Sequence, residues 1–77
     1  MAITSAQCRM ARAALHLGIR ELAALAKVSP NTIARLERGE VLFDNTLQAV
    51  QGALENAGIE FIPENGGGPG VRLARRN

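Results

Sequence analysis

The chain has 77 residues, of which nine are Lys or Arg and seven are Asp or Glu, and its formal net charge is +2. A chain of this length forms at most one domain with a marginal core, and its one Cys and one His exclude an internal disulfide and a zinc site of the usual type. Because it has no secretory signal and no apolar run of the roughly 18–20 residues that span a bilayer, we expect a cytoplasmic protein. We expect no metal or cofactor, and we expect self-association to add to the stability of the small core.

Residues 5–15 form the first predicted helix. Thr4 and Gln7 have the spacing of a capping box, which satisfies free backbone N–H groups at a helix start. The apolar face of this helix repeats at spacings of three and four and contains Cys8, Ala11 and Leu15. Cys8 is therefore expected to be a small core residue. Gly18 interrupts the pattern and allows a turn.

A second predicted helix covers residues 19–26, and a third covers residues 29–38. The third begins with Ser29 and Pro30, because serine caps a first turn and proline fits the first helical position. Gly39 is predicted to end it. The residues of these two helices expected to face the core are Leu22, Ala23, Ala26, Ile33 and Leu36.

Residues 45–57 form the fourth predicted helix, which follows an apolar connection. Asn45 and Gln48 repeat the capping spacing, and Gly58 ends the pattern. The buried stripe is expected to be Leu47, Val50, Leu54 and Ala57. The connection contains Val-Leu-Phe at residues 41–43, which is too apolar for free solvent, so at least one of the three is expected to fold back on the core.

After the fourth helix the period of the sequence changes to two, which predicts a strand over residues 59–63. The glycine-rich residues 66–70 are not followed by Gly-Lys-Ser/Thr, so we interpret them as a flexible loop and not as a phosphate-binding loop. Residues 71–75 alternate as a second strand, which completes a β-hairpin. An isolated hairpin is marginal in water, so it is expected to pack on the helices or to pair with a second chain.

One motif runs through the second and third predicted helices. It consists of Leu-Ala, four residues, Val-Ser, three residues, Ile, two residues, Leu-Glu, one residue and Gly, and it covers residues 22–39. Together with Arg12, Leu17-Gly18 and Glu21, this motif resembles the helix-turn-helix domain of the Cro/C1-type, or XRE, family of bacterial and phage repressors. The resemblance implies a mainly α, four-helix, lambda-repressor-like domain over residues 1–58, followed here by a C-terminal β-hairpin and basic tail over residues 59–77.

The resemblance also implies sequence-specific binding of double-stranded DNA. The outward positions of the third helix that match the family's base-contacting positions are Pro30, Asn31, Thr32 and Arg35. The chemistry agrees for Asn31, which can pair with adenine, and for Arg35, which can pair with guanine. Pro30 offers only apolar contact, and Thr32 matches a position that contacts a phosphate or a base. The alternative is an ordinary exposed helix face.

Four residues that flank the second and third helices are candidates for phosphate contacts: Arg20, Lys27, Arg38 and Asn45. Ile19 stands where the family usually has Gln, so the second helix would hold phosphate through its N-terminal amides and Arg20. Lys27 stands where the family favours Gly, and a left-handed backbone there would cost about 1 kcal/mol. The resemblance further implies an ion pair between Arg12 and Glu37 that braces the third helix.

We therefore expect a nucleoid-associated transcriptional regulator, most simply a repressor that binds a palindromic operator as a homodimer. The candidate dimer element is the hairpin, through Ile59, Phe61, Val71 and Leu73, and its rival is the fourth helix with residues 41–43. The tail arginines, Arg72, Arg75 and Arg76, could contact a phosphate or lie in solvent. The alternative function is a protein-interaction module on the same fold, such as an antitoxin or anti-activator, with secondary DNA binding. An enzyme is not expected, because no catalytic pairing is visible.

Overall fold

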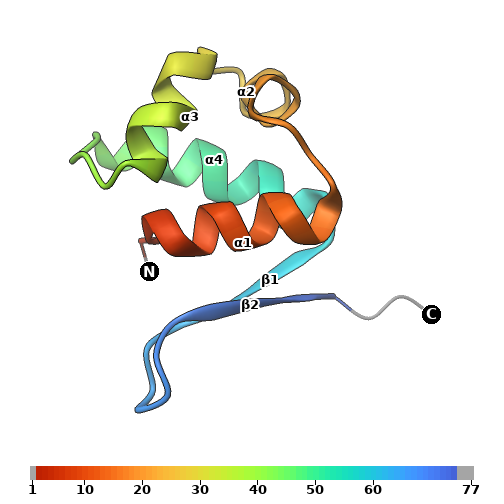
Figure 1. The fold of residues 1–77 in the computed structure, drawn as a ribbon, viewed down its shortest axis with the longest axis vertical. Helices are drawn as coiled ribbons and strands as arrows, with labels where there is room; N and C mark the ends of the chain where they lie inside the picture. Colours follow the sequence, from red (N-terminus) through yellow and green to blue (C-terminus); the bar gives the residue numbers. More distant parts are fainter. Residues whose placement is uncertain (1, 75–77) are drawn as a thin grey trace.

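The computed structural model describes residues 2–74 as four helices followed by a two-stranded antiparallel hairpin (Figure 1). The helices are α1 (Ser5–Leu15), α2 (Ile19–Ala26), α3 (Pro30–Glu37) and α4 (Asp44–Asn56), and the strands are β1 (Ile59–Ile62) and β2 (Gly70–Leu73). The predicted fold class, mainly helical with a C-terminal β-hairpin, is confirmed. The predicted second strand extended to residue 75, but β2 ends at Leu73, and residues 75–77 lie outside the described part.

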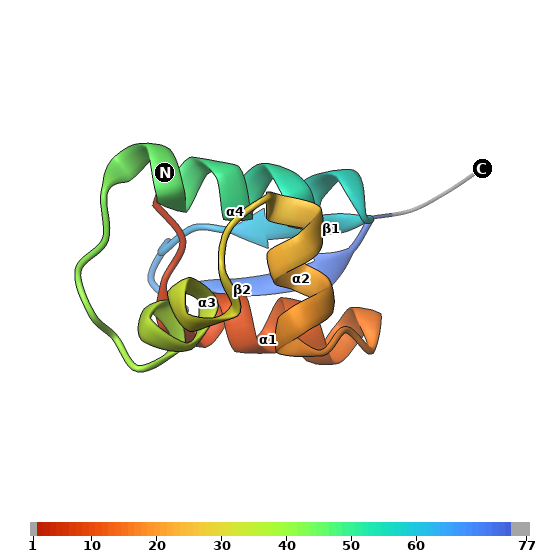
Figure 2. The same ribbon diagram turned by 90° about the horizontal axis from the view of Figure 1, so that it is seen from above.

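The elements are stacked in three layers. α2 and α3 form one outer layer, α1 and α4 run along opposite sides of the middle layer, and the hairpin forms the other outer layer (Figures 1 and 2). α2 packs against α4 and α3 packs against α1, while β2 contacts α1 and β1 contacts α4. The hairpin therefore bridges the two middle helices on the side that faces away from α2 and α3.

The hydrophobic core lies where the three layers meet. Its buried residues are Ile3, Cys8, Ala11, Leu22, Ala23, Ala26, Ile33, Leu36, Val50, Leu54, Ile59 and Phe61. The predicted inward residues of α2 and α3 are all among them, and Cys8 is a core residue as expected. In the connection before α4, Leu42 packs against the core, whereas Val41 and Phe43 remain 94% and 83% exposed.

Two of the three predicted helix caps are confirmed. The Thr4 hydroxyl accepts from the Gln7 amide at 3.1 Å, and the Gln7 side chain accepts from the Thr4 amide at 2.9 Å. The Ser29 hydroxyl likewise accepts from the Thr32 amide at 3.1 Å, at the start of α3.

The predicted cap at Asn45 is wrong. α4 begins at Asp44, and the residue that precedes its first turn is Phe43, which has an extended backbone and makes no side-chain capping bond. The amides of Thr46 and Leu47 bond instead to the Phe43 carbonyl, at 3.0 and 3.1 Å. Leu42 packs against the core, and the helix begins two residues after it, with Phe43 as the cap. Asn45 therefore lies exposed in the first turn.

The hairpin packs on the helices through alternate side chains. Ile59 pairs with Leu73 and Phe61 pairs with Val71 in the strand register. Ile59 and Phe61 are only 3% and 9% exposed, because they face α1 and α4 of the same protomer. They are therefore not available for the dimer contacts predicted for them, and Val71 is also partly buried against the core. Of the four candidates only Leu73, at 59%, is well exposed.

Gln7 also fastens the loop end of the hairpin to α1. Its side chain is fully buried, and its Nε2 donates to the carbonyl oxygens of Ile62 at 3.1 Å and Gly70 at 3.0 Å. Because its Oε1 accepts from the Thr4 amide, the whole side-chain amide is satisfied. Gln7 thus serves two purposes, and its capping spacing in the sequence indicates only the first.

Candidate nucleic-acid interface

α3 is fixed in the outer layer by Ile33 and Leu36, which are both buried. The predicted base-contacting residues remain accessible: Pro30 and Asn31 are exposed, and Thr32 and Arg35 are partly exposed. Thr32 also shares a hydrogen bond with the Ser29 hydroxyl at 2.9 Å. The structure therefore brings these four predicted residues together along one short helix.

The turn between α2 and α3 depends on Lys27. This residue has φ 60° and ψ 43°, the left-handed conformation whose cost was expected at this position. The Lys27 amide bonds to the Ala24 carbonyl at 3.3 Å, and the Val28 amide bonds to the Ala23 carbonyl at 3.0 Å. The Lys27 side chain is exposed, as are the other predicted phosphate contacts, Arg20, Arg38 and Asn45.

The end of α3 is braced by an ion pair with α1. Arg12 donates twice to the Glu37 carboxylate, from Nε and Nη2, both at 2.8 Å, and the two side chains are 22% and 9% exposed. Arg12 Nη1 also donates to the Leu17 carbonyl at 3.1 Å. Two more donors on α1 reach Glu37: Cys8 Sγ bonds to its carboxylate at 3.3 Å, and Arg9 bonds to its carbonyl at 2.6 Å. The ion pair that the family resemblance implies is thus present.

This cluster changes the pKa of Glu37, Arg12 and Cys8. Burial disfavours the charged form of Glu37, but the hydrogen bonds from Arg12 and Cys8 outweigh it, so the pKa of Glu37 lies below its usual value. The same hydrogen bond raises the pKa of Arg12. Burial and the bond to Glu37 raise the pKa of Cys8 to about 12. Because the thiolate is the reactive form, Cys8 has a structural role.

Glu40 is a member of this surface that the sequence patterns did not single out. Its Oε1 accepts from Arg35 Nε at 2.9 Å, and its Oε2 accepts from Arg38 Nε at 3.1 Å and Nη2 at 2.7 Å. The hydrogen bonds from Arg35 and Arg38 hold the pKa of Glu40 below its usual value. The available signal was Gly39, since a helix that ends on glycine turns the next residue back toward its last turn.

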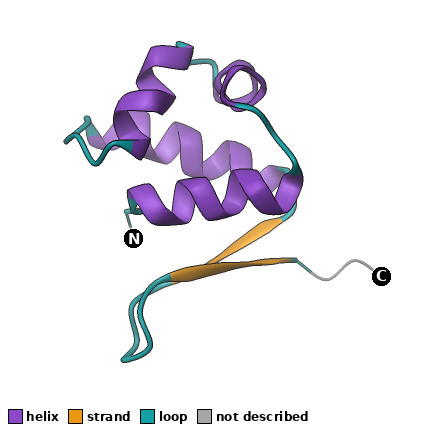
Figure 3. Cartoon of the chain, in the orientation of Figure 1, coloured by secondary structure: helices purple, strands orange, loops and turns teal. Residues whose placement is uncertain are grey.

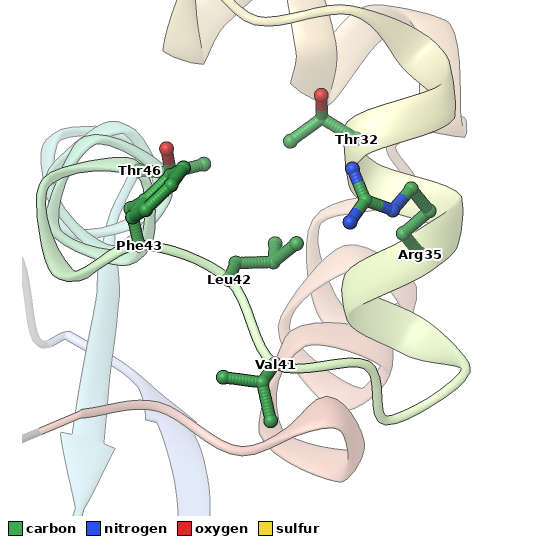
Figure 4. Close-up of a pocket in the computed structure, with 6 residues that line it drawn as sticks. All are labelled: Thr32, Arg35, Val41, Leu42, Phe43 and Thr46. Atoms are coloured by element: carbon green, nitrogen blue, oxygen red, sulfur yellow. The ribbon is translucent and has the colours of Figure 1, made fainter.

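A recess of about 430 Å³ lies between α3 and the segment that leads into α4 (Figure 4). It is lined by Thr32, Arg35, Val41, Leu42, Phe43 and Thr46. Thr32 and the Arg35 guanidinium line it from α3, and the Leu42 side chain points toward them, whereas the Val41 side chain points away from α3 (Figure 4). The accessible surface of α3 therefore continues onto residues 41–46.

Arg72 of β2 lies away from this surface. Arg72 Nε donates to Glu60 Oε1 at 2.5 Å across the two strands. The hairpin is separated from α3 by the layer of α1 and α4 (Figure 3), so Arg72 cannot join α3 on one face. The predicted phosphate contacts at Arg75 and Arg76 lie outside the described residues.

Two other kinds of site are absent from residues 2–74. No three His, Cys, Asp or Glu side chains are grouped there so that they could hold a metal ion, and no helix there has the length and hydropathy needed to cross a membrane. Comparison of the chain with protein-family models and with curated proteins gives no match. The functional assignment therefore rests on the geometry of α3 and its neighbours.

Proposed function

We propose that this chain binds double-stranded DNA sequence-specifically through α3, as a transcriptional regulator and most simply as a repressor that occludes its operator. The observation that carries the proposal is the division of α3 into a buried stripe and an accessible side. Ile33 and Leu36 hold the helix, while Asn31 and Arg35 stay accessible with side chains suited to adenine and guanine. A short helix of this kind, following a tight turn, has the size to enter a major groove about 12 Å wide.

The sequence resemblance to the Cro/C1-type family supports the same proposal. The residues that carry it lie on α1, α2, α3 and the turns between them. The Arg12–Glu37 ion pair and the left-handed turn at Lys27 are local features that the resemblance led us to expect. The proposal therefore includes membership of this family and association with the nucleoid.

The proposal also includes a homodimer, because one module of this size offers a small interface for tight specific binding. With Ile59 and Phe61 in the protomer core, the surface that favours self-association is the rival one beside the start of α4. There Val41 and Phe43, two positions apart in the chain, expose large apolar side chains. Such a pair suits a symmetric contact between two copies.

A second candidate function is a protein-interaction module in which the same exposed pair contacts a different protein. The observation in its favour is also Val41 and Phe43. The two candidates differ in their dependence on salt. Binding to DNA weakens steeply as salt concentration rises, because each phosphate contact releases condensed counterions. An apolar protein contact does not weaken in this way.

The test is a selection of bound sequences from random duplex DNA, made with the wild-type chain, Asn31→Ala and Arg35→Ala. We expect a palindromic site, loss of one adenine preference with Asn31→Ala, and loss of one guanine preference with Arg35→Ala. Each loss should be worth about 1–3 kcal/mol of discrimination. Gln48→Ala, an exposed change on α4, is the matched control and should leave the site unchanged. An absence of enriched sequence, or identical sites for all variants, would contradict the proposal.

A further inference from the structure

Glu40 places a carboxylate on the surface assigned above to DNA, where a negative charge repels phosphates of every sequence. It contacts Arg35 and Arg38 together. We propose that Glu40 is a specificity-determining positioning residue, which orients the Arg35 guanidinium for base recognition at the expense of sequence-independent affinity. This inference rests on the proposed function and adds to it a residue that would not touch a base itself.

The backbone holds Glu40 beside Arg35. α3 ends with Gly39 at φ 90°, and the Gly39 amide bonds to the Leu36 carbonyl at 3.0 Å. The Glu40 amide then bonds to the Arg35 carbonyl at 3.1 Å, which completes the usual helix-ending motif. Residues 35 and 40 are therefore joined through their backbones as well as through Nε and Oε1.

The contact leaves the recognition end of Arg35 available. Glu40 bonds to the Nε of Arg35. Within residues 2–74, the two terminal nitrogens of Arg35 make no hydrogen bond. Those nitrogens form the planar fork that matches O6 and N7 of guanine. Figure 4 shows the guanidinium lying beside Thr32 at the recess, which places the fork next to the accessible side of α3. A side chain already held in one orientation loses less entropy when it binds.

Arg38 has a different part in the same contact. It donates to Glu40 from both Nε and Nη2, and so it holds the carboxylate from the side opposite Arg35. Its remaining donors can meet a phosphate, which has no sequence information. Removing Arg38 should therefore weaken binding to all sequences, whereas removing the Glu40 charge should act on one base preference.

The experiment uses the full chain in five forms. They are wild type, Glu40→Gln, Arg35→Ala, Arg38→Ala and the double variant Glu40→Gln with Arg35→Ala. Binding is measured over a range of salt concentrations to the selected site, to that site with the Arg35-dependent guanine replaced, and to a random duplex. The specificity ratio is the affinity for the selected site divided by the affinity for the site with the guanine replaced. We expect Glu40→Gln to lower this ratio roughly fivefold, while the affinity for the random duplex stays equal or rises. In the Arg35→Ala background the same change should leave the ratio unaltered. Arg38→Ala should keep the ratio and lower the salt slope by about one.

The matched control is Glu60→Gln, which neutralises another exposed carboxylate, paired with Arg72 on the opposite outer layer. It should change neither the ratio nor its dependence on Arg35. If Glu40→Gln leaves the ratio within about twofold of wild type while Arg35→Ala abolishes it, the positioning role is overturned and the proposed function stands. A fall in affinity for every duplex in equal proportion would also overturn it. If the wild-type chain shows no sequence preference, the proposed function and this inference both fail.

Discussion

At the scale of single residues, the helix ends concentrate the strain of this chain. α1 and α2 end on residues with positive φ, His16 at 56° and Lys27 at 60°, and Gly39, one residue beyond the end of α3 at Arg38, has φ 90°. Each lets the following amide bond back to a carbonyl five residues earlier, as in Leu17 to Arg12. Only Gly39 adopts this conformation without a Cβ penalty. The two turns that precede α3 thus carry a local cost that tertiary packing has to offset.

Lys27→Gly should stabilise the protein. Relief of about 1 kcal/mol of left-handed strain is partly offset by the greater unfolded-state entropy of glycine, so we expect a net gain of roughly 0.5 kcal/mol in the free energy of unfolding. Urea denaturation followed by circular dichroism measures it. Ala24→Gly, an exposed position within α2, is the control and should lose up to about 1 kcal/mol. Equal losses for both variants would show that Lys27 is not strained.

Glu37→Gln should destabilise the protein by about 3 kcal/mol, because it leaves Arg12 without its carboxylate partner in a partly buried site. It should also change the dependence of stability on pH. The pKa of Glu37 is lower in the folded state, so its contribution is present above the unfolded value of 4.5 and is lost as pH falls through the folded value. Denaturation between pH 7 and pH 3 should therefore be less pH-dependent in the variant. The exposed Glu60→Gln serves for comparison and should leave stability little changed.

At the scale of elements, the connection between α3 and α4 links two surfaces. Leu42 packs against the core, Glu40 contacts Arg35 and Arg38, and the side chains of Val41 and Phe43 are exposed to solvent. Alternation along this short segment sends successive side chains in opposite directions. The same segment therefore borders the surface proposed for DNA and supplies the surface proposed for a dimer.

Val41→Ser with Phe43→Ser should weaken the proposed dimer. The change removes apolar area that would be buried between two copies, each side chain being worth about 1.5–3 kcal/mol when fully buried. Sedimentation velocity over a concentration series measures the shift toward monomer. Leu25→Ser, a half-exposed apolar residue of α2, is the control and should not shift it. A dimer of unchanged strength would exclude residues 41–43 as its interface and return attention to the exposed strand residue Leu73.

At the scale of the whole molecule, the hairpin and α3 occupy opposite outer layers with α1 and α4 between them. The hairpin covers the side of α1 and α4 that faces away from α2 and α3, and it supplies Ile59 and Phe61 to the same core that holds α3. It therefore supports α3 through packing at a distance. The stabilising role of the hairpin and the DNA contact proposed for α3 are thus separated in space.

Phe61→Ala should cost about 3–5 kcal/mol in the free energy of unfolding, because it opens a cavity under α1 and α4. Leu73→Ala, on the facing strand but well exposed, should cost much less. Thermal denaturation distinguishes the two. Below the melting range, the folded Phe61→Ala protein should keep the base preferences of wild type, since the substituted side chain is on the far side of the middle layer. Altered preferences at low temperature would contradict this separation.

Features that depend on neighbours in the chain were predictable from the sequence. The capping box at Thr4, the serine cap and proline start of α3, the hairpin and the inward stripes of the helices, except for Ala57 at the end of α4, follow from spacings of two to four residues. The errors lie where such a spacing competes with packing. Asn45 has the right spacing for a cap, but Leu42 on the core brings the chain into α4 earlier.

What the sequence by itself determined, then, is the order of the elements, the faces they bury and the chemistry available along α3. Only the tertiary structure decided which surfaces are free. It placed Ile59 and Phe61 in the protomer core, gave Gln7 its second set of partners, and brought Glu40 onto Arg35 and Arg38. The physical reason is that local conformation depends on residues a few positions apart, whereas exposure and side-chain partners depend on how distant segments meet.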